Sequence, residues 1–152
     1  MPELLTALDT TVLVEHGTFD LLDDGGPQRA GMDFADRTRW LAAGPNAVTV
    51  RSAAAWDHVA ALRLEVWDGP APDQPGWADR RDAQARFDSG LVEVNPLVDA
   101  GEDEEAVELA PGRYAVRAYV TGRDELLAVQ HQPDADLDGI ERYLIQFWPL
   151  QQ

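Results

Sequence analysis

The sequence predicts an all-β protein, an antiparallel β-sandwich of about eight strands with one short helix at most. Apolar residues recur mostly at every second position, as they do in strands that bury one face. Clusters of glycine, proline and aspartate separate these stretches at short intervals. With 152 residues, the chain is also long enough to bury a core. We therefore expect a single β-sandwich domain over residues 1–152.

In the first half of the chain, alternating apolar residues predict four strands. They cover Thr10 to Glu15, Phe19 to Leu21, residues 47–53 and residues 60–67. Residues 23–31 are expected to form a loop, because glycines and a proline interrupt them. Residues 32–46 are expected to hold one short helical turn that Gly44-Pro45 ends.

The second half repeats the hairpin pattern. Strands are expected at residues 83–87, 92–94, around 107, 114–120 and 142–149. Residues 71–81 are expected to form a loop. The last strand is apolar on both faces, which is typical of a strand covered on both sides. Residues 123–131 suit a helix as well as a strand, so both interpretations stay open.

The charge balance is strongly acidic, with 28 acidic and 12 basic residues and a net charge of -16. Such a chain repels nucleic acid and anionic lipid surfaces, and its field favours encounter with cationic partners. The other interpretation is that the charge only maintains solubility. The sequence has no cysteine, no leader pattern and no membrane span. We therefore expect a cytoplasmic protein without a cofactor that binds neither nucleic acid nor membranes.

The stretch "DADLDGIERYLIQFWP", residues 134–149, begins like an EF-hand calcium loop. Asp134, Asp136, Asp138 and Gly139 fit its first, third, fifth and sixth positions. The twelfth position, which must supply a bidentate glutamate, is Ile145, so the stretch is not an EF-hand. Two interpretations remain: a calcium site of another geometry that includes Glu141, and an aspartate-rich turn into the last strand. We predict no metal site.

No catalytic motif is present. His16, His58 and His131 share no metal-ligand spacing, and Ser52 and Ser89 lie in no recognisable nucleophile motif. Phosphate-binding and dinucleotide-binding glycine loops are absent from the sequence. The sequence therefore predicts a protein that is not an enzyme.

Two features are candidates for binding a partner. Trp67 falls on the polar face of its strand and Trp77 in a loop, whereas Trp40, Trp56 and Trp148 are expected in the core. The acidic run Glu102, Asp103, Glu104 and Glu105 is a candidate steering patch for a basic partner. The alternatives are a loop that folds back over the two tryptophans and a solvated acidic loop.

Several stretches resemble the ComJ family of small acidic proteins, which inhibit a DNA-entry nuclease. They are "VLVEHGTFDLLD", "MDFADRTRWLAAGPNAVTV", "HVAALRLEVWDG", "LAPGRYAVRAYV" and "RYLIQFWP", within residues 11–149. The chain also resembles a set of actinobacterial proteins with the same ending. The similarity lies in the order of strands and in a few turn and aromatic positions, so it transfers no functional residue.

Charge, motifs and resemblance together predict a non-enzymatic binding protein. It would act as an inhibitor or immunity protein that occludes a basic nuclease or toxin. The alternative is a calcium-dependent or carbohydrate-binding β-sandwich module that uses the loop from Asp134 to Glu141.

Overall fold

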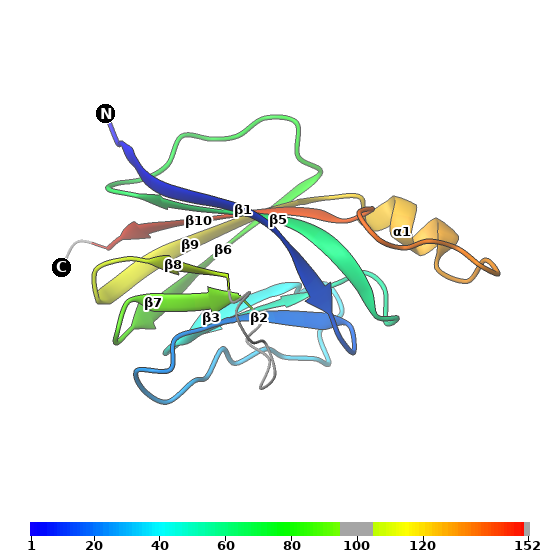
Figure 1. Cartoon of the computed structure of the whole chain (residues 1–152), viewed down its shortest axis with the longest axis horizontal. Coiled ribbons are helices and arrows are strands. Elements are labelled where there is room, and N and C mark those ends of the chain that lie inside the picture. The colour runs from blue at the N-terminus through cyan, green and yellow to red at the C-terminus, as the bar shows by residue number, and fades with distance from the viewer. Residues whose placement is uncertain (95–104, 151–152) are drawn as a thin grey trace.

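The computed structural model describes residues 1–94 and 105–150, and it forms two facing β-sheets with one short helix at one end (Figure 1). The strands are β1 (Leu4–Val14), β2 (Thr18–Leu22), β3 (Leu41–Gly44), β4 (Ala47–Arg51), β5 (His58–Trp67), β6 (Asp79–Phe87), β7 (Leu91–Val94), β8 (Ala106–Glu108), β9 (Gly112–Thr121) and β10 (Arg142–Pro149). The helix, α1, spans Arg123–Val129. The predicted all-β class is confirmed, with ten described strands in place of about eight.

Each sheet has five strands. The first has the order β1-β5-β10-β9-β6 and the second the order β3-β4-β2-β7-β8. All neighbours pair antiparallel except β5 and β10, which run parallel. The strand that comes last along the described chain therefore lies at the centre of its sheet.

The core lies between the sheets and follows from the alternation within the strands. In β5, residues 58, 60, 62, 64 and 66 are buried and face inward, and β9 and β10 contribute their own alternate residues. Aromatic rings fill the centre: Phe19 meets Tyr143 edge-on with ring centroids 5.2 Å apart, and Phe87 meets Phe147 at 5.7 Å. The first contact joins the two sheets, whereas the second links β6 and β10 within the first sheet.

The outer face of the first sheet is covered as well, by the segment between β5 and β6. Its Ala71 is buried, its Gln74 N–H donates to the Tyr119 hydroxyl at 3.1 Å, and its Trp77 ring lies against that of Tyr119. This cover explains why Leu144 and Trp148, on the outer side of β10, are also buried.

The prediction of a helical turn within residues 32–46 is wrong. Single turns close there by bonds from Asp36 N–H to the Asp33 carbonyl and from Arg39 N–H to the Asp36 carbonyl. The chain then enters β3, which the sequence did not indicate. Gly44-Pro45 belongs to the β3–β4 hairpin turn, where Asn46 takes φ 56°. Asparagine tolerates this left-handed conformation, so a tight turn forms where a helix end was expected.

Other boundaries also differ from expectation. β1 begins at Leu4, well before Thr10, and β6 begins at Asp79, within the expected loop. Residues 123–129 form a helix, so of the two structures left open for residues 123–131, helix or strand, the helix is present. Among the described residues, no helix has the length and apolar character that a membrane span needs.

Two buried polar side chains hold the turns at one end of the sandwich. Asp23 accepts hydrogen bonds from the N–H groups of Gly25, Ser89 and Gly90 and from the Ser89 hydroxyl, at 2.6 to 3.0 Å. Burial alone would raise the pKa of Asp23, but these donors lower it. Asn46 joins the neighbouring turns through Asp88 and the Pro27 carbonyl. The β6–β7 turn is thereby tied to the loops after β2 and β3.

Candidate functional site

A buried polar cluster lies at the end of the sandwich near α1. The Ser52 hydroxyl donates to Glu141 Oε1 at 2.6 Å, and the Ala53 N–H donates to Glu141 Oε2 at 2.8 Å. His58 Nε2 lies 3.4 Å from both Glu141 Oε1 and Ser52 Oγ. The His58 and Glu141 side chains are fully buried. The cluster therefore joins the segment after β4, the start of β5 and the segment before β10.

The contacts of His58 indicate that its ring is charged. Nδ1 lies 2.8 Å from the Trp56 carbonyl oxygen, which can only accept, so Nδ1 carries a proton. Nε2 faces a carboxylate oxygen and a hydroxyl whose hydrogen is already donated to that carboxylate. Without a proton, the lone pair of Nε2 would repel these two oxygens. A proton on Nε2 removes the repulsion, and the imidazolium then pairs with the Glu141 carboxylate.

The pKa shifts agree with an ion pair. Burial alone would lower the pKa of His58, but the bonds to Glu141 and the Trp56 carbonyl raise it. Burial alone would raise the pKa of Glu141, but His58, Ser52, the Ala53 N–H and the nearby Arg123 lower it. Arg123 on α1 lies 3.8 Å from Glu141 and also donates to the Arg51 carbonyl at 2.8 Å. The cluster thus fixes α1 to the sheet.

Ser52, His58 and Glu141 have the residue types of a hydrolase triad but not its connectivity. In a triad, the histidine stands between the serine and the acid and takes the proton of the hydroxyl. Here the serine donates directly to the acid, and the other histidine nitrogen binds a backbone carbonyl. Ser52 is also buried. This arrangement supports a structural role. The sequence did not predict that these three residues meet. It did place His58 among the alternate residues of β5 that face inward.

In the loop from Asp134 to Glu141, three carboxylates accept hydrogen bonds from the protein itself. Asp138 accepts the Val59 N–H at 2.8 Å, Asp136 accepts the Asp138 N–H, and Glu141 is engaged in the buried cluster. Asp134 has a positive φ of 58°, and Gly139 one of 79°. No group of three or more potential metal-ligating side chains occurs within residues 1–94 and 105–150. The geometry favours the aspartate-rich turn.

Metal depletion tests this interpretation directly. We expect the melting temperature to stay within about 1 °C on addition of EDTA or of millimolar calcium, because Asp136, Asp138 and Glu141 already have protein partners. Differential scanning calorimetry in both conditions measures it. A rise of several degrees with calcium would instead identify the loop as a calcium site.

A groove of about 440 Å³ lies at the opposite end, between β1 and β8. Its lining comes from five elements or their flanks: Leu5, Thr6, Val66, Trp67, Asp68, Glu108, Leu109, Ala110, Tyr114 and Pro149. Two of these described lining residues are acidic and none is basic. The starts of β1 and β9 and the ends of β5 and β10 meet here, away from α1 (Figure 1). The groove thus combines apolar walls with negative charge.

Trp67, one of the predicted site residues, lines this groove. Its ring is half-buried, and its Nε1–H donates to Glu65 at 2.9 Å, which fixes the ring before any partner arrives. Glu65 is itself buried and bonded to Arg63 and Gln146. A half-exposed aromatic ring held in this way is suited to act as an anchor at an interface.

The other predicted residues have different positions. Trp77 is half-buried against Tyr119 on the outer face of the first sheet. Glu105 is exposed and directly precedes β8, the strand that contributes Glu108 to the groove. Glu102, Asp103 and Glu104 lie outside the described residues. Of the tryptophans expected in the core, Trp40 and Trp148 are buried, but Trp56 is 57% exposed. Its loop precedes β5, so the alternation of the strand does not extend to it.

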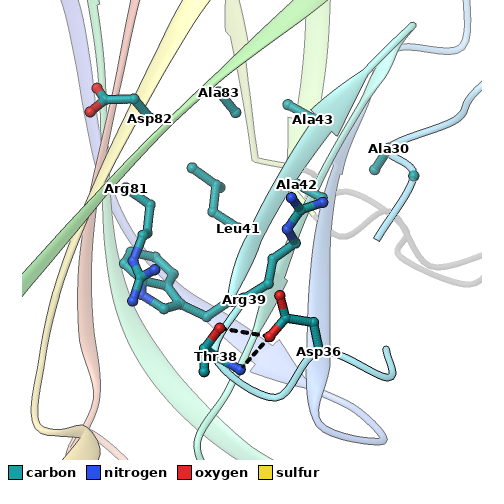
Figure 2. A pocket seen from close by; sticks show the side chains of 12 residues that line it. Ala30, Asp36, Thr38, Arg39, Leu41, Ala42, Ala43, Arg81, Asp82 and Ala83 are labelled. Carbon is teal, nitrogen blue, oxygen red and sulfur yellow. Dashed lines mark hydrogen bonds between the residues drawn. The ribbon is translucent and has the colours of Figure 1, made fainter. Parts of the chain in front are cut away.

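A second groove, of about 390 Å³, lies between the edge strands β3 and β6 (Figure 2). Its charged lining residues are balanced, with Arg39 and Arg81 against Asp36 and Asp82. Arg81 is paired with Asp79 at 3.0 Å, and Asp36 accepts from Thr38 at 2.6 Å. The groove thus favours neither sign of ligand charge, in contrast to the groove between β1 and β8.

Comparison with known proteins finds similarity in structure and not in sequence. No protein-family model matches the chain, and a search of the curated proteins finds no match. The structure is similar to that of ComJ, inhibitor of the DNA degrading activity of NucA, from Bacillus subtilis. The TM-score is 0.59 over 99% of both chains, at 11% identity.

A second similar structure is that of crocagin biosynthetic gene J. Its TM-score is 0.56 over 97% of this chain and 100% of that chain, at 14% identity. Identities of this size establish a shared fold alone. The predicted resemblance to ComJ is therefore confirmed at the level of the fold.

Proposed function

We propose that this protein is a non-enzymatic inhibitor that occludes a basic nuclease or toxin with the groove between β1 and β8. The observation that carries the proposal is the groove itself, where apolar walls and acidic side chains occur together beside Trp67, whose ring is held by Glu65. The net charge of -16 supports it, as does a fold shared with a nuclease inhibitor. Cationic groups that hold nucleic acid phosphates are complementary to such a surface.

The mechanism would be competition for those cationic groups. Acidic side chains on and beside β8 would accelerate the encounter, because opposite charges steer association at low ionic strength. Trp67 and Leu5 would then supply the apolar contact that slows dissociation. Glu102 to Glu105, which immediately precede β8 in the sequence, are proposed to extend the same negative field.

The direct test adds the purified protein to DNA-degradation assays with NucA and with basic nucleases encoded by the same genome. We expect at least one nuclease to be inhibited at a stoichiometry near one to one, more strongly at low salt. The proposal fails if none of these nucleases is slowed by an excess of the protein.

Charge variants then locate the surface. We expect Glu105→Gln/Glu108→Gln to slow association about three- to tenfold at low salt and to flatten its salt dependence. The matched control is Asp124→Asn/Glu125→Gln on α1, which removes the same charge at the opposite end. Neutralising Glu102 to Glu105 together should have a larger effect than the double variant. Equal effects of the groove variant and the α1 control, measured by stopped flow, would argue against the groove.

A further inference from the structure

On one side of the sandwich, the edge strand β3 of one sheet lies beside the edge strand β6 of the other. The two strands are joined at one bridge, between Pro45 and Arg86, where the Asn46 N–H donates to the Arg86 carbonyl at 2.7 Å. Elsewhere in the described chain they form no ladder with each other. Two grooves follow each other along this line, which we call the seam. The first is the groove of about 390 Å³ beside residues 41–43 and 81–83 (Figure 2), and the second, of about 260 Å³, lies beside residues 44–45 and 84–86.

Backbone groups of β3 point into the seam at alternate residues. In an antiparallel pair, each residue turns both its N–H and its C=O either toward the partner strand or away from it, in alternation. The Trp40 carbonyl accepts a hydrogen bond from β4 at 2.8 Å, so Trp40 faces β4. Leu41 and Ala43 therefore face the seam. Within residues 1–94 and 105–150, no backbone hydrogen bond crosses the seam to these two residues.

β6 contributes backbone groups in the same way. The Arg86 carbonyl points away from β9 and toward Asn46, so Asp82 and Gln84 also turn their N–H and C=O groups to the seam. No described backbone group across the seam is bonded to them. Both edges thus offer donors and acceptors at the spacing of a strand. An extended peptide that adds to a sheet edge uses this pattern.

The charge of the seam is opposite in sign to that of the whole chain. The first groove alone is balanced, but the second adds two arginines. The charged lining residues are then four arginines and two aspartates: Arg39, Arg81, Arg86, Arg113, Asp36 and Asp82. The chain as a whole has 12 basic and 28 acidic residues. At physiological ionic strength, charges more than about 8 Å away are largely screened, so the seam and not the net charge acts on a bound group.

Two of these arginines form a like-charged pair. Arg86 and Arg113 are exposed and lie directly opposite each other in the β6–β9 ladder, an arrangement that destabilises a sheet. Arg86 is paired with Asp88 at 3.1 Å, whereas the Arg113 guanidinium forms no ion pair with any described residue. A carboxylate bound between the two guanidinium groups would remove the repulsion, because arginine binds carboxylates through paired hydrogen bonds.

We propose that the seam binds an extended acidic peptide segment of a partner protein. The peptide backbone would pair with the edge groups that face the seam, and one of its carboxylates would bind between Arg86 and Arg113. Single-stranded nucleic acid is the other polyanion to consider. It is disfavoured because Asp36 and Asp82 would repel its phosphates, and because no exposed aromatic ring occurs among the described lining residues for bases to stack on.

Fluorescence anisotropy tests the proposal with the free protein in about 0.15 M NaCl. The probe is a labelled, acetylated peptide of alternating valine and glutamate, about eight residues long, which a strand edge of this length accommodates. We expect saturable binding that weakens about tenfold or more for the peptide of alternating valine and glutamine. A glutamate peptide N-methylated at its valines keeps its charge but loses backbone donors, so it should weaken equally. Full binding of the methylated peptide or of a short oligo-dT overturns the proposal, as does no binding of the probe at about 0.5 mM.

Variants of the protein locate the bound peptide. Arg113→Gln should weaken binding about fivefold or more. Arg142→Gln, at an exposed position of β10 outside both grooves, should leave it unchanged. The chain contains no cysteine, so Gln84→Cys should form a disulfide under oxidised glutathione with a probe that carries a central cysteine. Glu108→Cys, in the groove between β1 and β8, should not.

Equal effects at positions 113 and 142, or equal cross-linking at positions 84 and 108, overturn the proposal. The seam contains neither β1 nor β8, so its failure would leave the proposed function standing.

Discussion

Replacing Glu141 with alanine is expected to lower the free energy of unfolding by about 3 to 5 kcal/mol. The reason is that the buried His58 ring would lose its counter-ion, while the Ser52 hydroxyl and the Ala53 N–H would lose their acceptor. Urea denaturation measures the loss. The control is Glu125→Ala on α1, an exposed residue whose replacement should change stability by less than about 0.5 kcal/mol.

The pH dependence of this loss identifies the ion pair. The folded pKa of Glu141 lies below its ordinary value of 4.5, so its stabilisation is present above that value and is lost as the pH falls through the folded pKa. The folded pKa of His58 lies above 6.5, so its contribution is present below that value and is lost as the pH rises through the folded pKa. The pair therefore stabilises the fold most between these values.

The conservative variant Glu141→Gln tests the charge itself. We expect the difference in unfolding free energy between wild type and Glu141→Gln to increase from about pH 3 to about pH 5.5. A difference that is the same at both pH values would show that shape and hydrogen bonding, and not charge, account for the role of Glu141.

Replacing Asp23 with alanine is expected to lower the free energy of unfolding by about 3 kcal/mol. Four donors would lose their acceptor, and the side chain that links the loop after β2 to the β6–β7 turn would be gone. A buried donor without a partner costs about 1 to 3 kcal/mol, and solvent entering the vacated space recovers part of that cost.

The adjacent residue provides a matched control for this variant. Asp24 is exposed, so Asp24→Ala removes the same charge one position along the chain at little expected cost. Both variants are compared by urea denaturation at one pH. If Asp23→Ala loses less than about 1 kcal/mol more than Asp24→Ala, the side chain of Asp23 does not hold the two loops together.

Much of the fold could be predicted because alternation is a local signal. The inward residues of β5 and β9, and the two apolar faces of β10, follow from consecutive letters of the sequence. The hairpin turn at Asn46 could not be separated from a helix end, because Gly44-Pro45 suits both. Trp56 shows the other limit: it continues the spacing of β5, but the strand begins only at His58. A periodic pattern carries no information beyond the end of its strand.

The site was harder to predict because its parts are distant in sequence. Ser52 and Glu141 are 89 residues apart, and no spacing rule connects them. One signal was available: His58 has the inward phase of an apolar strand, so a buried polar partner was to be expected for it. The groove near Trp67 also depends on which strands form the edges of the two sheets, and strand order follows from pairings that no short motif encodes.

The central place of β10 also affects how the molecule is made. On a ribosome, β5 and β9 emerge before the strand that separates them, so both expose a row of unpaired backbone N–H and C=O groups until residues 142–149 arrive. The parallel contact joins residues that are 81 positions apart, and closing so long a loop is slow for a small domain. Nascent chains halted before residue 142 should therefore resist protease poorly, and chaperones should recognise them more readily than the finished protein.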